Sequence, residues 1–208
     1  MDSPTGTDLV TLDPDRSLWE RVFVVAPLVV IGTAETDGSY DLAPKHMATP
    51  LGWGPYFGFV CTPRHATYRN AKRDGAFTVT FVRPSQVVLA ALAAAPRSDG
   101  KGADGPGAKP SLQTLDTTPA SVVRGQFLAD GYLFLECELE QVVDGFGENS
   151  LIAGRIVAAH AHPDSMRISD ADEAERLAEA PLLAYLHPGR YAEIAETHAF
   201  PFPAGFKR

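Results

Sequence analysis

The feature that most constrains the fold of this chain is a succession of short apolar runs rich in β-branched and aromatic residues. The first three are 22–34 (VFVVAPLVVIGTA), 56–62 (YFGFVCT) and 76–82 (AFTVTFV). Runs of this length and composition are typical of buried β-strands. Pro27 marks a bend or an edge in the first run, because proline lacks the N–H that a ladder needs. The pair Asp37-Gly38 that follows predicts a hairpin.

Two later segments continue the strand pattern. Residues 131–144 (GYLFLECELEQVVD) alternate between apolar and polar side chains, and 150–162 (SLIAGRIVAAHAH) is again apolar and β-branched. The alternation places Glu136, Glu138 and Glu140 on one face of the first of these strands. Carboxylates so arranged would also suit acid–base catalysis, but the in/out alternation of an antiparallel sheet is the simpler explanation. We therefore expect this face to be solvated.

Helical composition is confined to three shorter segments. Residues 66–74 predict a short helix that ends at Gly75, because glycine favours the left-handed conformation of a helix C-terminus. Residues 85–95 are rich in Ala and Leu, and Ser85 is in position to cap them. The third helical segment is 169–180.

Many strands at short spacing, with few helices, predict a mainly β fold: an antiparallel barrel with helices packed outside. No Gly-x-Gly-x-x-Gly phrase follows a strand, so a Rossmann dinucleotide site has no support. We expect 1–208 to form a single domain, with an N-terminal extension over 1–17. The segment at about 96–112, dense in Gly, Pro and Lys, is expected to be a flexible loop.

Composition and charge argue against several classes of function. Hydrophobic residues make up 45% of the chain, yet no apolar run reaches the roughly 20 residues of a transmembrane helix. The polar, acidic start is unlike a signal peptide, so we expect a cytoplasmic protein with no membrane partner. A formal net charge of −8 argues against nucleic acid as a partner. Cys61 and Cys137 lie far apart and are expected to be free thiols in or near the core.

A compact basic run, Arg64–Arg73 (RHATYRNAKR), stands out in this acidic chain. It leads from a predicted strand into a predicted helix, where unpaired backbone N–H groups favour an anion. The hydroxyl and N–H of Thr67 suit a phosphate, to which Arg64 and Arg69 would add charge. Lys45 can reach in from the preceding loop. A solvated helix face is the alternative explanation, and the residues alone leave both open.

Four short phrases occur in a fixed order along the chain. They are Asp41-Leu42-Ala43-Pro44, His65-Ala66-Thr67-Tyr68-Arg69-Asn70, Gly75-Ala76-Phe77-Thr78-Val79 and Gly154-Arg155-Ile156-Val157. In this order they resemble the motifs of the flavin reductase-like family, whose members are FMN-binding split β-barrels. The resemblance covers roughly residues 18 to 195 and includes a closing segment in which a Gly precedes a Tyr. It implies an antiparallel split β-barrel with a few flanking helices.

The resemblance also implies a flavin site built from two loops. The isoalloxazine ring and ribityl chain would contact Lys45, His46, Met47 and Ala48. The phosphate would be surrounded by Thr62, Arg64, His65 and Thr67, with Asn70 supporting the loop. Many members carry Gly-Asp-His before a later strand, where this chain has Gly147-Glu148-Asn149. Asn149 would therefore lie near the cofactor, but its amide hydrogen-bonds without titrating.

The function implied by the resemblance is that of an oxidoreductase. Such a protein is a homodimer that binds FMN, or sometimes FAD, near the subunit interface and takes hydride from NAD(P)H. The flavin carries the chemistry and the protein positions the rings, so no catalytic side chain is assigned. The alternative is a flavin-binding electron carrier, or a flavin donor to a partner oxygenase, without nicotinamide activity of its own.

Two pairs of side chains suggest other chemistry. His160 and His162 share one face of a predicted strand, but the third ligand that zinc needs is not evident, so no metal is assigned. Cys61 and His65 could act as nucleophile and base in an enzyme without flavin. A cysteine that closes an apolar strand is more simply a packing residue.

Further residues remain open between packing and function. His187 and Tyr191 either border the flavin of a neighbouring subunit or pack the end of the barrel. Trp53 is expected in the core or in a dimer interface. Lys101 or Lys109, from the segment at about 96–112, could fold over the cofactor.

Overall fold

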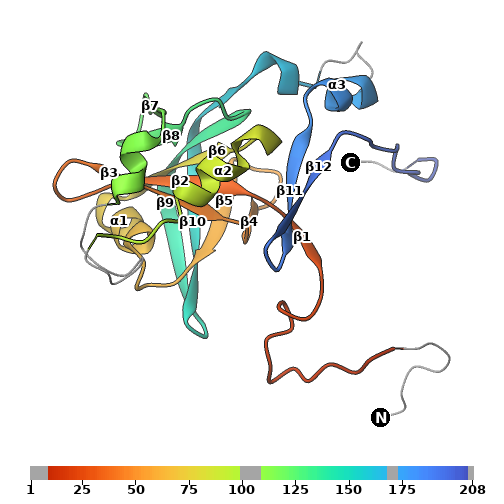
Figure 1. The fold of residues 1–208 in the computed structure, drawn as a ribbon, viewed down its shortest axis with the longest axis horizontal. Coiled ribbons are helices and arrows are strands. Elements are labelled where there is room, and N and C mark those ends of the chain that lie inside the picture. Colours follow the sequence, from red (N-terminus) through yellow and green to blue (C-terminus); the bar gives the residue numbers. More distant parts are fainter. Residues whose placement is uncertain (1–8, 99–108, 168–172, 206–208) are drawn as a thin grey trace.

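The body of the molecule is a curled antiparallel sheet of seven strands (Figure 1). The computed structural model describes residues 9–98, 109–167 and 173–205. The strand order is β3-β2-β6-β9-β10-β5-β4. The bounds are β2 Val29–Ala34, β3 Tyr40–Lys45, β4 Ala48–Pro50, β5 Tyr56–Cys61, β6 Ala76–Phe81, β9 Leu133–Phe146 and β10 Asn149–Ala161. The predicted mainly β, antiparallel split-barrel fold with a few flanking helices is confirmed.

Smaller elements surround this sheet. A second sheet, in the order β1-β11-β12, is formed by β1 Val24–Pro27, β11 Leu182–His187 and β12 Arg190–Ile194. A two-stranded hairpin consists of β7 Thr117–Pro119 and β8 Gln126–Leu128. The α-helices are α1 Ala66–Asp74, α2 Val87–Leu92 and α3 Glu173–Glu179. Short 3₁₀ turns cover η1 Pro84–Gln86, η3 Pro110–Thr114 and η4 Pro163–Ser165. Among the described residues, no helix is long and apolar enough to cross a membrane.

The first apolar run forms two strands rather than one. Pro27 ends β1, and β2 begins two residues later in a different sheet. The hairpin predicted at Asp37-Gly38 is confirmed, because β2 pairs with β3 across this turn. The backbone N–H of Glu35 donates to the carbonyl of Ser39 at 2.7 Å, and Gly38 has a φ of +90°. Such a φ is accessible to glycine without strain.

Helix α1 matches its prediction, whereas α2 is shorter than expected. Gly75 ends α1 in the left-handed conformation, and its N–H donates to the carbonyl of Ala71. In the segment 85–95, Ser85 lies within η1, so Gln86 is the N-cap residue of α2 and makes no side-chain capping bond. Of the segment predicted as 169–180, the part from Glu173 to Glu179 is helical, and the residues before Glu173 lie outside the described part.

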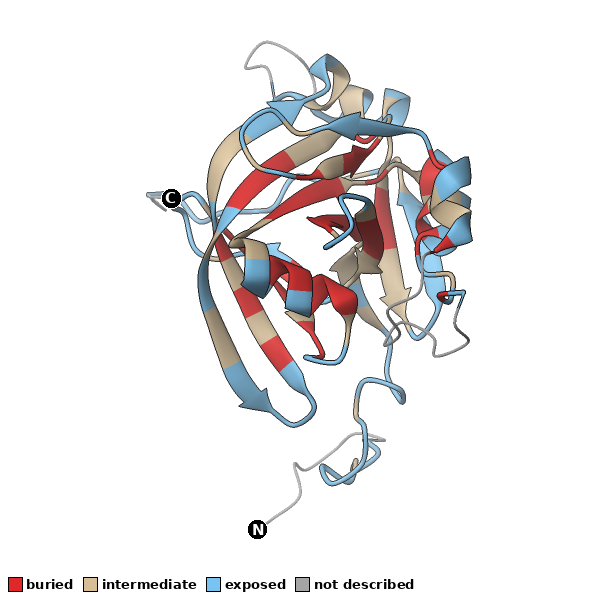
Figure 2. Cartoon of the chain, turned by 90° about the vertical axis from the view of Figure 1, so that its left-hand side faces the viewer, coloured by how far each residue is buried: buried red, intermediate tan, exposed pale blue. Residues whose placement is uncertain are grey.

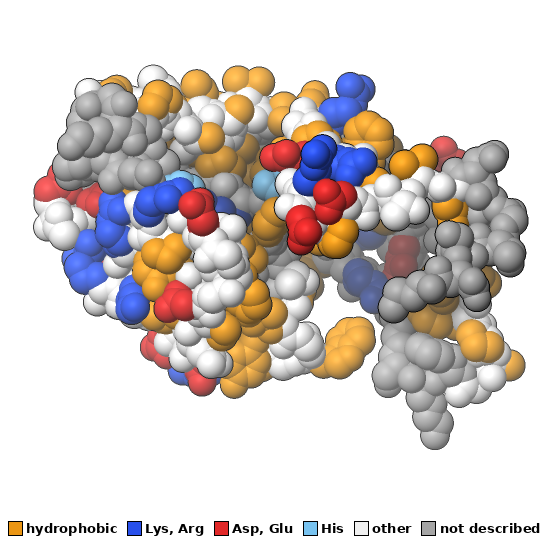
Figure 3. Space-filling model, turned by 90° about the horizontal axis from the view of Figure 1, so that it is seen from below, with side chains coloured by type: hydrophobic (Ala, Val, Ile, Leu, Met, Phe, Trp, Pro, Cys, Tyr) orange, Lys and Arg blue, Asp and Glu red, His pale blue; other side chains and the backbone are white. Residues whose placement is uncertain are grey.

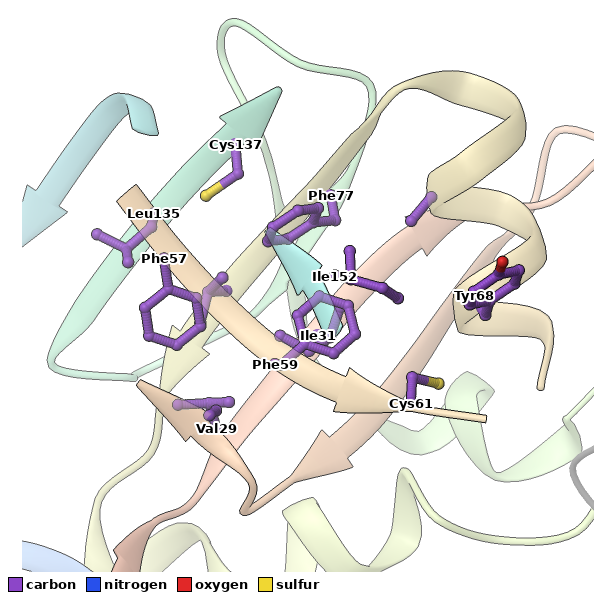
Figure 4. Packing of buried hydrophobic residues seen from close by; sticks show 13 residues of the cluster. Val29, Ile31, Phe57, Phe59, Cys61, Tyr68, Phe77, Leu135, Cys137 and Ile152 are labelled. Carbon is purple, nitrogen blue, oxygen red and sulfur yellow. The ribbon is translucent and has the colours of Figure 1, made fainter. Parts of the chain in front are cut away.

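The core forms on both faces of the curled sheet. Inside the curl, Phe57, Phe59, Phe77, Ile31 and Ile152 pack against one another, and Figure 4 shows their side chains converging from different strands. The other face is covered by α2 and η3 and includes a second cluster. Every residue of β2 is buried because both of its faces are covered. Figure 2 shows buried residues along the enclosing strands and exposed residues at the tip of the β9–β10 hairpin.

One sequence-based expectation about burial is wrong, and another is narrowed to one of its two alternatives. Glu136 is fully buried, whereas Glu138 and Glu140 on the same strand are exposed. The reason is local, because the chain at 121–123 folds over Glu136 and donates hydrogen bonds to its carboxylate. Trp53 is 99% exposed, which excludes the core and leaves the dimer interface as the prediction. The two cysteines, by contrast, are free thiols in the core as expected.

Candidate functional site

A cleft of about 190 Å³ lies between the end of β3 and the start of α1. Its polar walls are formed by Asp41, Lys45, His65, Thr67, Arg97 and Lys109. The basic run and the preceding loop, far apart in the sequence, are therefore brought together at one cavity. Of the predicted site residues, Lys45, His65 and Thr67 line this cleft.

The N-terminus of α1 contributes a positive partial charge to the cleft. The residue at the N-cap, His65, has an extended backbone conformation and makes no side-chain capping bond. The first turn of α1 contains no acidic residue, and Ala66 and Thr67 lie at the cleft wall. No carboxylate of α1 itself opposes the positive end of its dipole, although Asp41 of β3 lies beside Thr67, and backbone N–H groups at such a helix start favour an anion.

Behind the cleft lies a buried ion cluster centred on Asp41. Its Oδ1 is 2.7 Å from Lys109 Nζ and 3.2 Å from Arg97 Nη2. Its Oδ2 accepts a hydrogen bond from the hydroxyl of Thr67 at 3.3 Å. Asp41, Thr67, Arg97 and Lys109 are all at most 9% exposed. Buried charges require such partners, because each would otherwise lose its hydration without compensation.

The cluster is anchored to three neighbouring segments. Arg97 Nη2 lies 2.7 Å from Glu35 Oε1, at the end of the β2–β3 hairpin. Lys109 Nζ donates to the carbonyls of Leu42 at 2.9 Å and Ala93 at 3.1 Å. Both ends of the segment at about 96–112 are therefore packed against the barrel. The prediction for its centre, with Lys101, lies outside the described residues.

The loop after β3 joins the cleft to an aromatic stack. The ring of His46 stacks on those of Tyr185 and His187, with centroid distances of 4.6 and 5.1 Å. His46 Nε2 and His187 Nδ1 are buried and have no hydrogen-bond partner among the described residues. Burial lowers the pKa of His46, and the neighbouring His187 and Lys45 lower it further. Met47 is 44% exposed, and Ala48 is a core residue of β4.

Four of the predicted site residues lie around the cleft rather than in its wall. Thr62 is buried in the turn before α1, and its carbonyl accepts from the N–H of His65 at 3.1 Å. Arg64 is exposed and forms an ion pair with Glu148 at 3.0 Å. Asn70 donates to the hydroxyl of Thr33 at 3.2 Å and so ties α1 to β2. Asn149 is exposed at the start of β10.

The basic run continues on the outside of α1. Lys and Arg side chains gather on the side of the molecule formed by this helix (Figure 3). Lys72 and Arg73 lie in its last turn, where cations interact favourably with the helix dipole. The start of the basic run therefore borders the cleft, whereas its end is a solvated helix face.

Cys61 lies close to His65 but in an environment that disfavours the thiolate. Its Sγ is 3.8 Å from His65 Nδ1 and is buried beneath the start of α1. Burial raises the pKa of the thiol, and this outweighs the opposing effect of Lys45. Because a nucleophilic cysteine reacts as the thiolate, this arrangement favours a packing role.

The remaining histidines make separate contacts. His160 Nε2 is 3.5 Å from Glu136 Oε1, and His162 Nδ1 is 2.9 Å from Asp164 Oδ1. Within the described ranges there is no group of three His, Cys, Asp or Glu side chains that could hold a metal ion. His187 belongs to the aromatic stack, whereas Tyr191 is 54% exposed.

Sequence reasoning missed Arg97 and Asp41 as members of this site. Arg97 follows α2 in a stretch of Ala, Pro and Gly, and no motif marks it. Asp41 belongs to a family phrase, but its partners are far along the chain. One signal was available in the sequence. Arg97 and Lys109 lie on either side of the Gly-rich segment, and basic residues that become buried need an acidic partner.

The fold is shared with solved structures over nearly the whole chain. Component B of nitrilotriacetate monooxygenase from Bacillus cereus is 18% identical, with 94% of this chain and 100% of that chain covered and a TM-score of 0.75. Flavoredoxin from Methanosarcina acetivorans is 14% identical, with coverage of 96% and 98% and a TM-score of 0.72. An FMN-binding protein from Thermus thermophilus is 18% identical, with coverage of 93% and 99% and a TM-score of 0.69.

These identities are low, so the structural likeness shows the fold alone. No curated protein matches the chain by sequence. The family model described as "Flavin reductase like domain" matches residues 22–194, which run from just before β1 to the end of β12. The chain therefore belongs to the flavin reductase-like domain family.

Proposed function

We propose that this chain is an FMN-binding oxidoreductase that takes hydride from NAD(P)H. The observation that carries the proposal is the cleft at the start of α1, where the N-terminus of this helix meets Lys45 and the buried ion cluster centred on Asp41. Membership of a flavin-binding family supplies the cofactor class. When bound, the flavin supplies the redox chemistry, and the protein supplies binding and orientation.

The residues of the cleft fit the phosphate end of the cofactor. Three cationic side chains, Lys45, Arg97 and Lys109, line it against the carboxylate of Asp41, and Glu35 outside the cleft pairs with Arg97. A phosphate monoester carries a charge of about −1.5 to −2 near neutral pH, and the one positive charge in excess attracts it. Backbone N–H groups at the start of α1 are suited to its oxygens.

The loop that follows Lys45 fits the ring end. His46 and Met47 lie between the cleft and the aromatic stack, and the buried Nε2 of His46 has no hydrogen-bond partner among the described residues. A polar group of the flavin would satisfy this nitrogen. The role of His46 is thus to orient the ring, and the surrounding aromatic side chains exclude water.

The electron acceptor and the assembly belong to the same proposal. The likeness to component B of an oxygenase supports a partner oxygenase that receives reduced flavin. Met47, Trp53 and Phe146 are exposed, which supports a homodimer that covers apolar side chains near the flavin loop. We also infer that the protein acts in the cytoplasm.

Replacement of Lys45 tests the cleft. We expect Lys45→Ala to weaken FMN binding by at least about tenfold, because a charge-assisted contact to phosphate contributes roughly 1.5–3 kcal/mol. Lys72→Ala is the matched control, since Lys72 is exposed on α1 and outside the cleft. Binding is measured by quenching of flavin fluorescence during titration with protein. Equal affinities for Lys45→Ala, Lys72→Ala and the unaltered chain would place the phosphate elsewhere.

Likeness to a flavoredoxin favours one second candidate, a flavin-binding electron carrier without nicotinamide activity. The two candidates differ in how the bound flavin is reduced. Under anaerobic conditions, a reductase loses its visible flavin absorption within seconds of adding NADH or NADPH. A carrier keeps the oxidised spectrum with either nucleotide and loses it with dithionite.

A further inference from the structure

The ion cluster centred on Asp41 separates the cleft from a second cavity. This cavity has a volume of about 280 Å³ and lies between the β2–β3 hairpin, η3 and the strands β7 and β8. Asp41, Arg97 and Lys109 line both cavities. These three residues, which we call the partition, are therefore a shared wall between the two spaces.

The partition is held on both of its sides. On the side of the second cavity, Arg97 pairs with Glu35 at 2.7 Å. On the side of the cleft, Asp41 accepts from the hydroxyl of Thr67 at 3.3 Å. Lys109 Nζ donates to two carbonyls at 2.9 and 3.1 Å and forms an ion pair with Asp41 at 2.7 Å. Displacing the partition would break this network of buried charges.

We propose that the partition gives the cleft a closed end, so that it accepts the terminal phosphate of FMN and rejects the pyrophosphate of FAD. The inference rests on the proposed function, because it assumes that the cleft holds the flavin phosphate. A terminal monoester ends at the wall and presents a charge of about −1.5 to −2 to the cations. A pyrophosphate at the same place must continue into an adenosine, and the partition stands between the cleft and the second cavity.

The second cavity is suited to a flat polar ring. Its walls include Tyr40, Leu112 and Gln126. The Oε1 of Gln126 is buried and has no hydrogen-bond partner among the described residues. Such an acceptor suits an exocyclic amino group, and apolar walls suit a purine face. Removing the partition should therefore admit the adenosine that the intact wall excludes.

The experiment compares the dissociation constants of FMN, FAD and riboflavin for the unaltered chain and two variants. For the unaltered chain, we expect FMN to bind at least about tenfold tighter than FAD. Arg97→Ala removes one side chain of the partition. In this variant the affinities for FMN and FAD should come to within about threefold of each other, with FAD binding tighter than it does to the unaltered chain. The control is Arg155→Ala, which removes an exposed arginine from an ion pair with Glu138 on the far strands. This control should leave the preference unchanged.

A fourth ligand keeps the test independent of whether Arg97→Ala folds. The methyl ester of FMN is a phosphodiester with a single charge and no adenosine, and we expect the unaltered chain to bind it at least about tenfold more weakly than FMN. Thermal unfolding shows whether Arg97→Ala is folded.

The outcomes separate the two proposals. If the unaltered chain binds none of the flavins, the proposed function is overturned, and the partition inference with it. If it binds FMN, FAD and the methyl ester equally well, the partition inference alone is overturned. A folded Arg97→Ala that keeps the full preference for FMN also overturns it, as does one that loses the preference only because FMN binds more weakly. Loss of the preference with tighter binding of FAD, in this variant alone, supports it.

Discussion

A single carboxylate, that of Glu136, fixes the chain between β7 and β8. It accepts hydrogen bonds of 2.6 to 2.9 Å from three consecutive backbone N–H groups at 121–123 and from the hydroxyl of Ser121. Burial by itself raises the pKa of this carboxyl, but the four hydrogen bonds outweigh it and lower the pKa to about 2. The charged form is therefore the one that the folded protein stabilises.

The stability contributed by Glu136 should depend on pH. In the unfolded chain the carboxyl takes up a proton below its ordinary pKa of 4.5, whereas in the folded protein it stays ionised down to about 2. Its contribution is therefore complete above about pH 4.5 and is lost as the pH falls toward 2, at about 3 kcal/mol in total. Glu136→Gln should lower the free energy of unfolding by about this amount near neutral pH and by much less near pH 2.5.

Urea unfolding of both proteins across this pH range measures the difference. Other carboxyls, such as Asp164 with a pKa of about 2, titrate in both proteins and cancel in the comparison. A difference between the two proteins that does not change with pH would show that Glu136 acts by packing alone.

At the level of single residues, the sequence predicted which side chains meet better than it predicted burial. The basic residues and Thr67 were predicted to form an anion site, and Lys45, His65 and Thr67 do line one cleft, whereas the anion itself stays a prediction. Glu136 was expected in solvent because alternation shows which face a side chain takes, not what covers that face. Arg97 and Lys109 could not be paired with Asp41, because such contacts depend on how loops close over the sheet.

The strands are held in register by close packing at β10. Gly154 pairs with Phe57 of β5 and Leu139 of β9, where the β9–β10 ladder shifts its register. A Cβ added to Gly154 would lie 2.6 Å from ring atoms of Phe77 and 3.0 Å from the Cβ of Cys137. The glycine is thus required by the approach of a core aromatic ring, not by its backbone conformation.

Gly154→Ala should destabilise the protein by about 1–3 kcal/mol, the usual cost of overpacking a core. Phe77→Leu in the same chain makes room for the methyl group, so the double variant should recover part of the loss. Chemical denaturation of the two single variants and the double variant measures this coupling. Additive effects in the double variant would show that the ring of Phe77 is not what limits the space at Gly154.

At the level of elements, periodicity and turn residues were sufficient for most of the barrel. The long strands β9 and β10, helix α1 and the hairpin after β2 lie where the sequence placed them. Helix α2 is shorter than its Ala-rich segment, since the chain turns into the 3₁₀ conformation at Pro84 and leaves the helix after Leu92. Propensity does not determine where tertiary contacts end a helix.

The molecule as a whole exposes several large apolar side chains. Trp53, Phe23, Phe146 and Trp19 are 99%, 72%, 57% and 54% exposed. Single exposed apolar side chains are common on monomers, and the proposed homodimer would cover some of these four. The sequence could not decide whether Trp53 packs inside the barrel or outside it, because both environments favour an aromatic residue.

The proposed dimer predicts a change in the environment of Trp53 on dissociation. In a Trp19→Phe variant, tryptophan fluorescence reports on Trp53 alone. We expect a dimer in sedimentation, and we expect the emission of Trp53 to shift to longer wavelength as the protein is diluted below its dimerisation constant. A dimer whose Trp53 emission is already that of a solvated indole would mean that the interface lies elsewhere.

The three-stranded sheet β1-β11-β12 limits the order in which this domain can fold during synthesis. Val24 of β1 pairs with His187 of β11, so the first strand waits for a partner about 160 residues later in the chain. On the ribosome, the curled sheet can close as soon as β10 has emerged, while β1 is still unpaired. The apolar strand β1 thus stays unpaired until β11 has been translated, and this interval is when a nascent chain would most need a chaperone.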